Sequence, residues 1–233
     1  MRVRKRLFSF MAPASFLEFL WDFIPPNKQQ LFMERVKERT RFLTVVLEDI
    51  YQPHNASAVM RSCDCFGVQD IHIIENRNRW EYSPDVERGS SKWLSISRYN
   101  SGENNSAACI EALKAKGYEV VATTPRTDCT LESFRPQKPI ALIIGTEKKG
   151  ISEGILSRAD QLIKIPMVGF TESLNLSVAA AICIHHIKNR LKESSLNWHL
   201  REEQQEEILL EWCKKMIKSH ELYFKRFSEL PKG

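Results

Sequence analysis

Short unbroken apolar runs, separated by segments with helical character, constrain the fold of this chain more than any other feature. The clearest run covers residues 140–144 and contains no polar side chain. Strands of a parallel sheet are buried on both faces and read as continuous apolar runs, whereas half-exposed strands alternate. The sequence therefore predicts a parallel sheet, whose strands must be joined by crossover segments such as helices.

The same reasoning places the other elements of this α/β body. Expected strands cover residues 42–47, 71–74, 93–97, 119–123, 140–144 and 162–165. Expected helices cover residues 55–66, 106–116, 152–159 and 174–191. Gly67 and Gly117 follow two of these helices, as expected where a helix closes in the left-handed region. The repeated strand–helix–strand order predicts a doubly wound α/β domain.

Charge divides the chain into three parts. Residues 1–41 carry 9 Lys and Arg against 4 Asp and Glu, whereas residues 42–194 have 18 of each and residues 195–233 have 7 of each. We expect a basic N-terminal helical extension, a neutral α/β domain and a C-terminal helical extension. The basic extension indicates a polyanionic partner, because Lys and Arg release counterions from phosphates. A solvated arm that binds nothing is the alternative.

The start of the chain only partly fits a secretion signal. Basic residues precede the apolar stretch 7–23, but Glu18 and Asp22 interrupt it and two prolines follow. No other stretch approaches the length needed to span a bilayer. We expect a cytoplasmic protein with no membrane partner, in which the first residues form an interaction arm. Initiation at Met33 is the alternative.

The six cysteines are scattered and show neither a CxxC pair nor the Cys/His spacing of a zinc site. We therefore expect reduced thiols that mostly pack, and no metal. A redox-active pair of Cys63 and Cys65 is the less favoured alternative, because their side chains point in different directions on a helix. In the C-terminal extension, apolar residues at helical spacing predict a stripe that packs on the body or on a second subunit.

Three segments begin where an apolar run ends, and together they indicate one active site. They are HNASAVMR at 54–61, IGTEKKGI at 144–151 and IPMVGFTESLNLS at 165–177. Open α/β sheets bind ligands at the carboxyl ends of their strands, where such loops meet. The first strand is not followed by GxGxxG, and the second segment lacks the GK[ST] of a P-loop. Both absences disfavour a nicotinamide or nucleotide-binding enzyme of those types.

These three segments, with the turn at 88–93, resemble the motifs of the SpoU/TrmH group of the SPOUT superfamily, the 2′-O-ribose methyltransferases of RNA. The resemblance runs through about residues 40–192. It implies a SPOUT α/β knot, a Rossmann-like parallel sheet with a C-terminal trefoil knot. It also implies a homodimer and S-adenosylmethionine (SAM) as cofactor. The knot does not follow from the periodicity, since threaded chains are very rare.

The resemblance implies cofactor contacts at Thr123, Gly145, Ile165 and Leu174. Ile165, Met167 and Leu174 would line an apolar slot in which backbone groups recognise adenine. The expected catalytic residues are Asn55, Arg61, Glu147, Ser173 and Asn175. Ser173 and Asn175 also suit the cap of the following helix, and Glu147 suits a helix N-terminus; these are their alternative roles.

Methyl transfer to a ribose hydroxyl needs the donor methyl carbon and the 2′-oxygen in line, and a group that assists loss of the hydroxyl proton. The resemblance implies that Arg61 acts on the 2′-hydroxyl. A guanidinium resists deprotonation, so we expect Arg61 to clamp a phosphate and lower the pKa of the hydroxyl, with a phosphate oxygen or water taking the proton.

The expected RNA contacts are cationic or aromatic side chains outside the pocket, namely His54, Arg35, Arg39, Arg41, Lys92 and Arg190. The resemblance implies that members acting on ribosomal RNA often carry a separate N-terminal RNA-binding domain, and the N-terminal extension is too short for one. We therefore expect tRNA, at guanosine 18 of the D-loop, as substrate. The alternatives are ribosomal RNA methylation and a non-catalytic RNA-binding protein.

Overall fold

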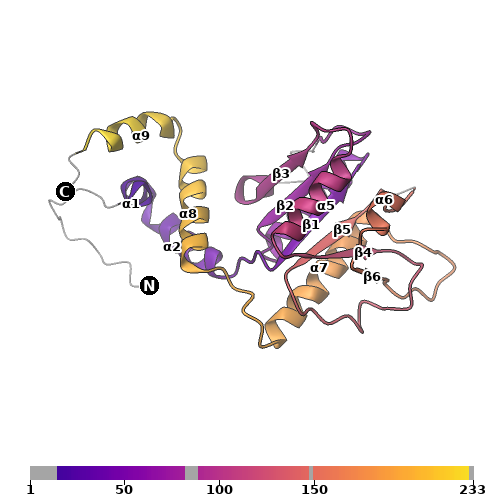
Figure 1. Cartoon of the computed structure of the whole chain (residues 1–233). Helices are drawn as coiled ribbons and strands as arrows, with labels where there is room; N and C mark the ends of the chain where they lie inside the picture. The colour runs from indigo at the N-terminus through magenta and orange to yellow at the C-terminus, as the bar shows by residue number, and fades with distance from the viewer. Residues whose placement is uncertain (1–14, 82–88, 147–148, 231–233) are drawn as a thin grey trace. The chain divides into compact units, whose positions relative to one another are not determined.

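The computed structural model describes residues 15–81, 89–146 and 149–230. It divides the chain into two compact units, which are described separately: residues 38–200, and residues 1–37 together with 201–233 (Figure 1). The chain thus passes between the units near residues 37 and 200, a few residues from the boundaries expected from composition.

The larger unit is built on a six-stranded sheet of order β3-β2-β1-β5-β4-β6. Every paired strand runs parallel to its neighbour. The strands are β1 (Leu43–Glu48), β2 (Asp70–Ile74), β3 (Ser95–Tyr99), β4 (Glu119–Thr123), β5 (Ile140–Ile144) and β6 (Gln161–Ile163). The expected parallel α/β body is confirmed. The last strand ends at Ile163, two residues early, because the chain then leaves the sheet to form the third motif.

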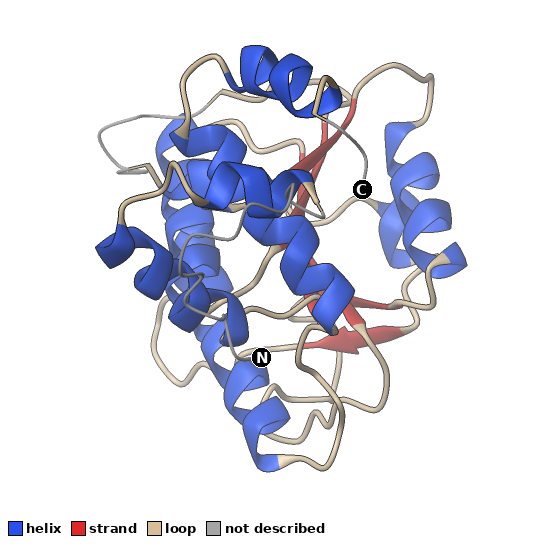
Figure 2. Cartoon of the chain, turned by 90° about the vertical axis from the view of Figure 1, so that its left-hand side faces the viewer, coloured by secondary structure: helices blue, strands red, loops and turns tan. Residues whose placement is uncertain are grey.

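Helices cover both faces of this sheet, which is seen nearly edge-on in Figure 2. They are α3 (Pro53–Cys65), α5 (Asn105–Ala115), α6 (Glu153–Leu156) and α7 (Leu176–Glu193), with a 3-10 turn η1 (Ser90–Trp93) before β3. Helix α3 begins two residues earlier than expected because Pro53 occupies its first turn, where a missing N–H costs nothing. The strand expected at 93–97 lies at 95–99, and Trp93 belongs to this turn instead.

Alternate residues of the central strand face two separate cores. Val45 and Leu47 belong to a cluster with residues of α3 and α7, whereas Val46 belongs to a cluster with residues of α5 and α6. All three side chains are fully buried. Burial on both faces explains why β1 and β5 read as unbroken apolar runs. It also fixes α3 and α7 on one face and α5 and α6 on the other.

The smaller unit contains α1 (Phe16–Trp21), α2 (Pro26–Lys37), α8 (Glu202–Met216) and α9 (His220–Ser228). Aromatic contacts join its N- and C-terminal parts: ring centroids lie 5.3 Å apart for Phe32 and Trp212, and 5.1 Å apart for Phe16 and Phe224. The two extensions, expected as separate appendages, therefore pack on each other. Met33 lies inside α2. No helix within the described residues is long and apolar enough to cross a bilayer.

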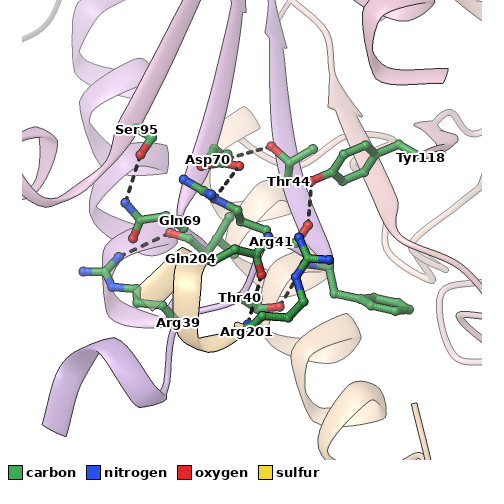
Figure 3. Close-up of polar contacts among 12 residues, drawn as sticks. Arg39, Thr40, Arg41, Thr44, Gln69, Asp70, Ser95, Tyr118, Arg201 and Gln204 are labelled. Atoms are coloured by element: carbon green, nitrogen blue, oxygen red, sulfur yellow. Dashed lines mark hydrogen bonds and ion pairs between the residues drawn. The ribbon is translucent and has the colours of Figure 1, made fainter. Parts of the chain in front are cut away.

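Polar contacts tie the first residues of the larger unit to the amino ends of its strands (Figure 3). Arg41 forms an ion pair with Asp70 at 3.3 Å, and its carbonyl accepts a 2.7 Å hydrogen bond from the Tyr118 hydroxyl. The Thr44 hydroxyl donates to the Asp70 carbonyl at 2.7 Å. These contacts link polar groups where the strands begin, at the edge of the sheet opposite the three motifs.

Candidate active site

A pocket of about 490 Å³ lies at the carboxyl ends of β4, β5 and β6. This volume falls within the range of small-molecule and cofactor sites, roughly 300–1,000 Å³. Its apolar lining comes mainly from Ile144, Ile165, Met167, Leu174 and Leu176. Polar groups contributed by residues such as Thr123, Thr146, Arg126, Glu153 and Glu172 also line it. The pocket thus offers both an apolar slot and charged groups.

Gly145 ends β5 at a place where no side chain fits. A Cβ there would collide with the backbone of Gly150 and Ile151. The loop is drawn this close because Thr146 and Gly150 exchange two backbone hydrogen bonds of 3.0 Å, with Gly150 at a φ of 66°. The close return of the loop exposes backbone groups to the pocket. Glu147, an expected catalytic residue, lies outside the described residues.

The third motif forms the loop between β6 and α7. Met167, Ser173 and Leu174 line the pocket from this loop, and Ile165 does so from just beyond β6. With Thr123 and Gly145, the structure therefore gathers all five expected cofactor-binding residues around one pocket. Ser173, expected to be catalytic, lies in the same lining.

A hydrogen bond between two asparagines joins the first motif to the third. Asn55, only 3 % exposed at the start of α3, accepts a bond of 3.1 Å from the Nδ2 of Asn175. Gln52 Oε1 accepts a second 3.1 Å bond from Asn55 Nδ2. Asn175 caps α7, since its Oδ1 accepts from the Ser177 amide at 2.9 Å and from the Ser177 hydroxyl at 2.6 Å. The capping role and the link between motifs are thus performed by the same side chain.

Arg61 lies on the exposed side of α3, away from buried Asn55. Six residues separate them, which on a helix with 3.6 residues per turn turns the two side chains to different faces. Among the described residues, none forms an ion pair or hydrogen bond with the Arg61 side chain. A guanidinium that no described residue engages is suited to binding an external anion.

Two of the expected RNA contacts are paired within the fold. Arg39 is 5 % exposed, forms an ion pair with Asp64 and donates to the Val68 carbonyl at 3.3 Å. Arg41 is held by Asp70, with its side chain 20 % exposed. Both lie before β1, at the amino edge of the sheet, and their charges are already used within the fold. The charge count could not reveal this, because it counts every Lys and Arg as available.

The other four expected RNA contacts differ in how exposed their side chains are and in the partners that they contact. His54 and Arg35 are exposed, and Lys92 is exposed with its ammonium 5.2 Å from the centroid of the Trp93 ring. Arg190 is half-buried: it donates to the Glu132 carbonyl at 3.2 Å and lies 3.6 Å from a Glu193 carboxylate oxygen. Arg35 belongs to the smaller unit, whereas the other three belong to the larger one.

Most of the cysteines are buried within the fold. All six, which fall within the described residues, are free thiols. Burial raises the pKa of Cys63 and raises that of Cys183 to about 12, so both remain protonated and pack. Cys65 is exposed, on another side of the helix from Cys63. No group of three or more His, Cys, Asp or Glu suited to a metal occurs among the described residues.

Sequence reasoning missed several charged residues of the pocket lining. Arg126 and Glu153 face each other at 3.7 Å, both more than four-fifths exposed, and Glu172 also lines the pocket. Arg126 follows β4 by three residues, so the carboxyl-edge rule that identified the motifs could have found it. Its segment was passed over because it belongs to none of the three motifs.

The chain matches the model of the SpoU rRNA Methylase family over residues 42–185. It is 37 % identical over 204 residues to the tRNA (guanosine(18)-2′-O)-methyltransferase of Borreliella burgdorferi, covering 87 % of this chain and 91 % of the relative. It is 35 % identical over 187 residues to the enzyme of the same name from Thermus thermophilus, covering 78 % and 93 %.

Solved structures agree with this match. The A. aeolicus TrmH/SpoU tRNA modifying enzyme superposes with a TM-score of 0.73 at 26 % identity, covering 82 % of this chain and 97 % of that one. The SpoU methyltransferase AviRb from Streptomyces viridochromogenes, in complex with AdoMet, gives a TM-score of 0.59 at 27 % identity, covering 70 % and 65 %. The motifs, the parallel sheet and these similarities together show that the chain belongs to the SpoU methylase family.

Proposed function

We propose that this protein is a tRNA (guanosine(18)-2′-O)-methyltransferase, which transfers a methyl group from SAM to the ribose 2′-hydroxyl of guanosine 18 in the D-loop. Relatives of this name share 29–37 % identity with the chain. The observation that carries the proposal is the Asn175–Asn55 bond, which ties the pocket loop to the helix that bears Arg61. This bond thereby holds the pocket for the methyl donor in a fixed position relative to Arg61, the cation that faces the substrate.

The pocket residues fit SAM. The apolar side chains of Ile165, Met167 and Leu174 suit a flat adenine, and backbone groups near Gly145 can bind its ring nitrogens. Arg126 suits the carboxylate of the methionine part, while Glu153 or Glu172 suits its ammonium. When bound there, SAM supplies the methyl group on its sulfonium.

Arg61 acts as the cation on the substrate side. Its exposed guanidinium, which no described residue engages, binds the RNA phosphate beside the target ribose and lowers the pKa of the 2′-hydroxyl by favouring the oxyanion. Because a guanidinium stays protonated at any working pH, the proton passes to a phosphate oxygen or to water. Asn55 and Asn175 position the substrate, and Glu147 and Ser173 complete the proposed catalytic set.

The homodimer and the trefoil knot are part of the proposal. Val178 and Ile182 lie one helical turn apart on α7 and are 47 % and 38 % exposed. Val168 and Phe170, in the loop that precedes α7, are fully exposed. Apolar side chains exposed in this way are suited to burial against a second copy of the chain. Sedimentation of the purified protein tests this point, and a monomer at micromolar concentration would contradict it.

The activity is tested by incubating the purified protein with SAM carrying a radiolabelled methyl group and with three RNAs. These are a tRNA transcript with guanosine 18, the same transcript with adenosine 18, and ribosomal RNA. We expect methylation of the first alone, with the 2′-O-methylguanosine located by mass spectrometry. Methylation of ribosomal RNA with an unmodified tRNA would reassign the substrate, and RNA binding without transfer would indicate a non-catalytic protein.

Arg61→Ala supplies the mechanistic test in the same assay. We expect kcat to fall by about 10²–10³, the usual contribution of a positioned group that assists proton loss. The matched control is Lys116→Ala, which removes an exposed cation that precedes β4 at the opposite edge of the sheet. Equal rates for the two variants would remove Arg61 from the mechanism.

A further inference from the structure

The segment 76–80, which follows β2, is an irregular loop held by several hydrogen bonds. The Asp49 Oδ1 accepts from the backbone amides of Asn76 at 2.7 Å and of Arg77 at 2.8 Å. It also accepts from the Asn78 amide at 3.4 Å, and the Asn78 side chain donates to the Asp49 carbonyl at 2.8 Å. One carboxylate therefore fixes three successive residues of the loop.

Asp49 adopts a strained conformation to make these bonds. Its φ is 50°, in the left-handed region that residues other than glycine seldom occupy. Such a conformation persists where the surrounding structure, often a functional site, requires it. The other end of the loop is held as well, since the Trp80 amide donates to Glu75 Oε1 at 2.6 Å.

The two carboxylates that hold the loop, those of Glu75 and Asp49, are occupied by other partners. Glu75 is 8 % exposed and receives two bonds from Arg98, of 2.9 and 2.7 Å, and a third of 2.9 Å from Asn100. These hydrogen bonds, led by the one from Arg98, lower the pKa of Glu75. Asp49 is engaged by the loop amides. Neither acid neutralises the arginines of the loop.

Arg77 and Arg79 are exposed on this ordered backbone. Among the described residues, none pairs with either guanidinium. A flexible loop would lose conformational entropy on ordering, whereas a preordered one binds without that cost. The protein thus holds the backbone of two arginines in place, and no partner within the described residues takes up their charges.

We propose that Arg77 and Arg79 bind backbone phosphates of the RNA substrate, next to the nucleotide that is methylated. The inference rests on the proposed function and adds a binding site to it. The loop follows β2, and β1 and then β5 are the next strands toward the pocket. Neighbouring strands lie about 4.8 Å apart, so β2 lies roughly 10 Å from β5 and 14 Å from β4. That span corresponds to about three or four nucleotides of a stacked strand.

The test compares the double variant R77A/R79A with the wild-type protein in tRNA binding and methylation. We expect the KM for tRNA to rise about tenfold with kcat unchanged. The slope of log K against log salt concentration should fall in magnitude by about 1.4–1.8, the value for two lost phosphate contacts. SAM affinity, measured by calorimetry, should stay the same.

The matched control is K116A/K138A, which removes two exposed cations close to the amino ends of β4 and β5. We expect its KM and salt slope to equal those of the wild type. If R77A/R79A behaves like this control while the wild type methylates tRNA, the inference fails and the proposed function stands. If the wild type modifies no tRNA, the proposed function itself fails.

Asp49→Gly tests whether the carboxylate positions the arginines. Glycine accepts the φ of 50° without strain but cannot hold the loop amides. We expect a several-fold rise in KM in the wild-type background and a smaller one in the R77A/R79A background. An equal rise in both backgrounds would mean that Asp49 acts only on stability and would overturn its positioning role.

Discussion

The two edges of the sheet use the same residue types for different purposes. At the amino edge, Arg39 and Arg41 are paired with Asp64 and Asp70, and their charges serve the fold. At the carboxyl edge, Arg77 and Arg79 are unpaired among the described residues. Parallel strands all point the same way, so one edge collects the loops that bind ligands and the other collects the connections that close the fold. The number of arginines therefore says less about RNA binding than the edge on which they lie.

Glycines repeat this contrast. Gly67, before β2, approaches the backbone of Glu38, and Gly145, after β5, approaches Gly150 and Ile151. Each position excludes a Cβ because another backbone segment passes close by. The first close approach secures the start of the larger unit, whereas the second shapes the pocket. Substitution by alanine should therefore affect stability at one edge and cofactor binding at the other.

Gly145→Ala is expected to have the largest effect on ligand binding. The added methyl group pushes the returning loop outward, and overpacking of this kind costs about 1–3 kcal/mol. If that cost falls on the SAM-binding loop, the affinity for SAM should drop by up to about 100-fold. Calorimetric titration with SAM measures it, and a separate titration with tRNA should show little change. An unaltered SAM affinity would separate this pocket from the cofactor.

Gly67→Ala should leave ligand affinity unchanged and lower the free energy of unfolding by about 2–3 kcal/mol. Alanine would meet the Glu38 carbonyl and would also be strained at a φ of 74°. Urea unfolding gives the stability, and SAM titration at a temperature where the variant is folded gives the affinity. Loss of SAM binding by the folded variant would contradict the assignment of stability to the amino edge and ligand binding to the carboxyl edge.

Arg39→Met should destabilise the protein by about 2 kcal/mol. The substitution leaves Asp64, with its side chain 26 % exposed, without its partner at the end of α3. Because Arg39 is buried and paired with Asp64, we expect the salt slope of tRNA binding to stay at the wild-type value, unlike that of R77A/R79A. A reduced slope in folded Arg39→Met would restore Arg39 as an RNA contact.

The sequence predicted the larger unit well because its physical signals are local. Burial on both faces makes β1 and β5 continuously apolar, and this alone indicated the parallel sheet. The family resemblance implied cofactor contacts at Thr123, Gly145, Ile165 and Leu174, and the loop after the last apolar run indicated that Ile165, Met167 and Leu174 line a slot; all five line one pocket. These features depend on strand order only through the rule that carboxyl ends meet at one edge.

Long-range partners could not be predicted in the same way. Whether Arg39 is free depends on Asp64, and whether Arg77 is ordered depends on Asp49, which belongs to a different strand connection. The packing of α2 on α8 joins residues from opposite ends of the chain, such as Phe32 and Trp212. No local pattern reports such pairs, so charge and helical spacing left the role of both extensions open.

Lys188 extends the comparison to pH. It lies near the end of α7, 3 % exposed, donates to the Glu38 carbonyl at 3.0 Å and places its ammonium 3.9 Å from the centroid of the Trp198 ring. Burial lowers the pKa of Lys188 to about 8, from an ordinary value of 10.5. Between these two values the unfolded chain holds a proton that the folded chain lacks, so stability rises with pH across this window and is lost as pH falls back through it.

Lys188→Met isolates this effect because methionine keeps an apolar stem against Trp198 but cannot titrate. Buried thiols and phenols such as Cys183 and Tyr118 titrate in both proteins, so their contribution cancels in the difference between the two unfolding free energies. Between pH 8 and pH 10.5 we expect the unfolding free energy of the wild type to rise by about 2 kcal/mol relative to that of the variant. This rise is smaller than the full pKa shift would give, because a charged Lys188 keeps its hydrogen bond and ring contact. Urea unfolding at both pH values measures it. If the unfolding free energies of the two proteins changed equally with pH, Lys188 would keep its ordinary pKa in the folded state. Glu38 and Trp198 would then stabilise the Lys188 ammonium as fully as water does.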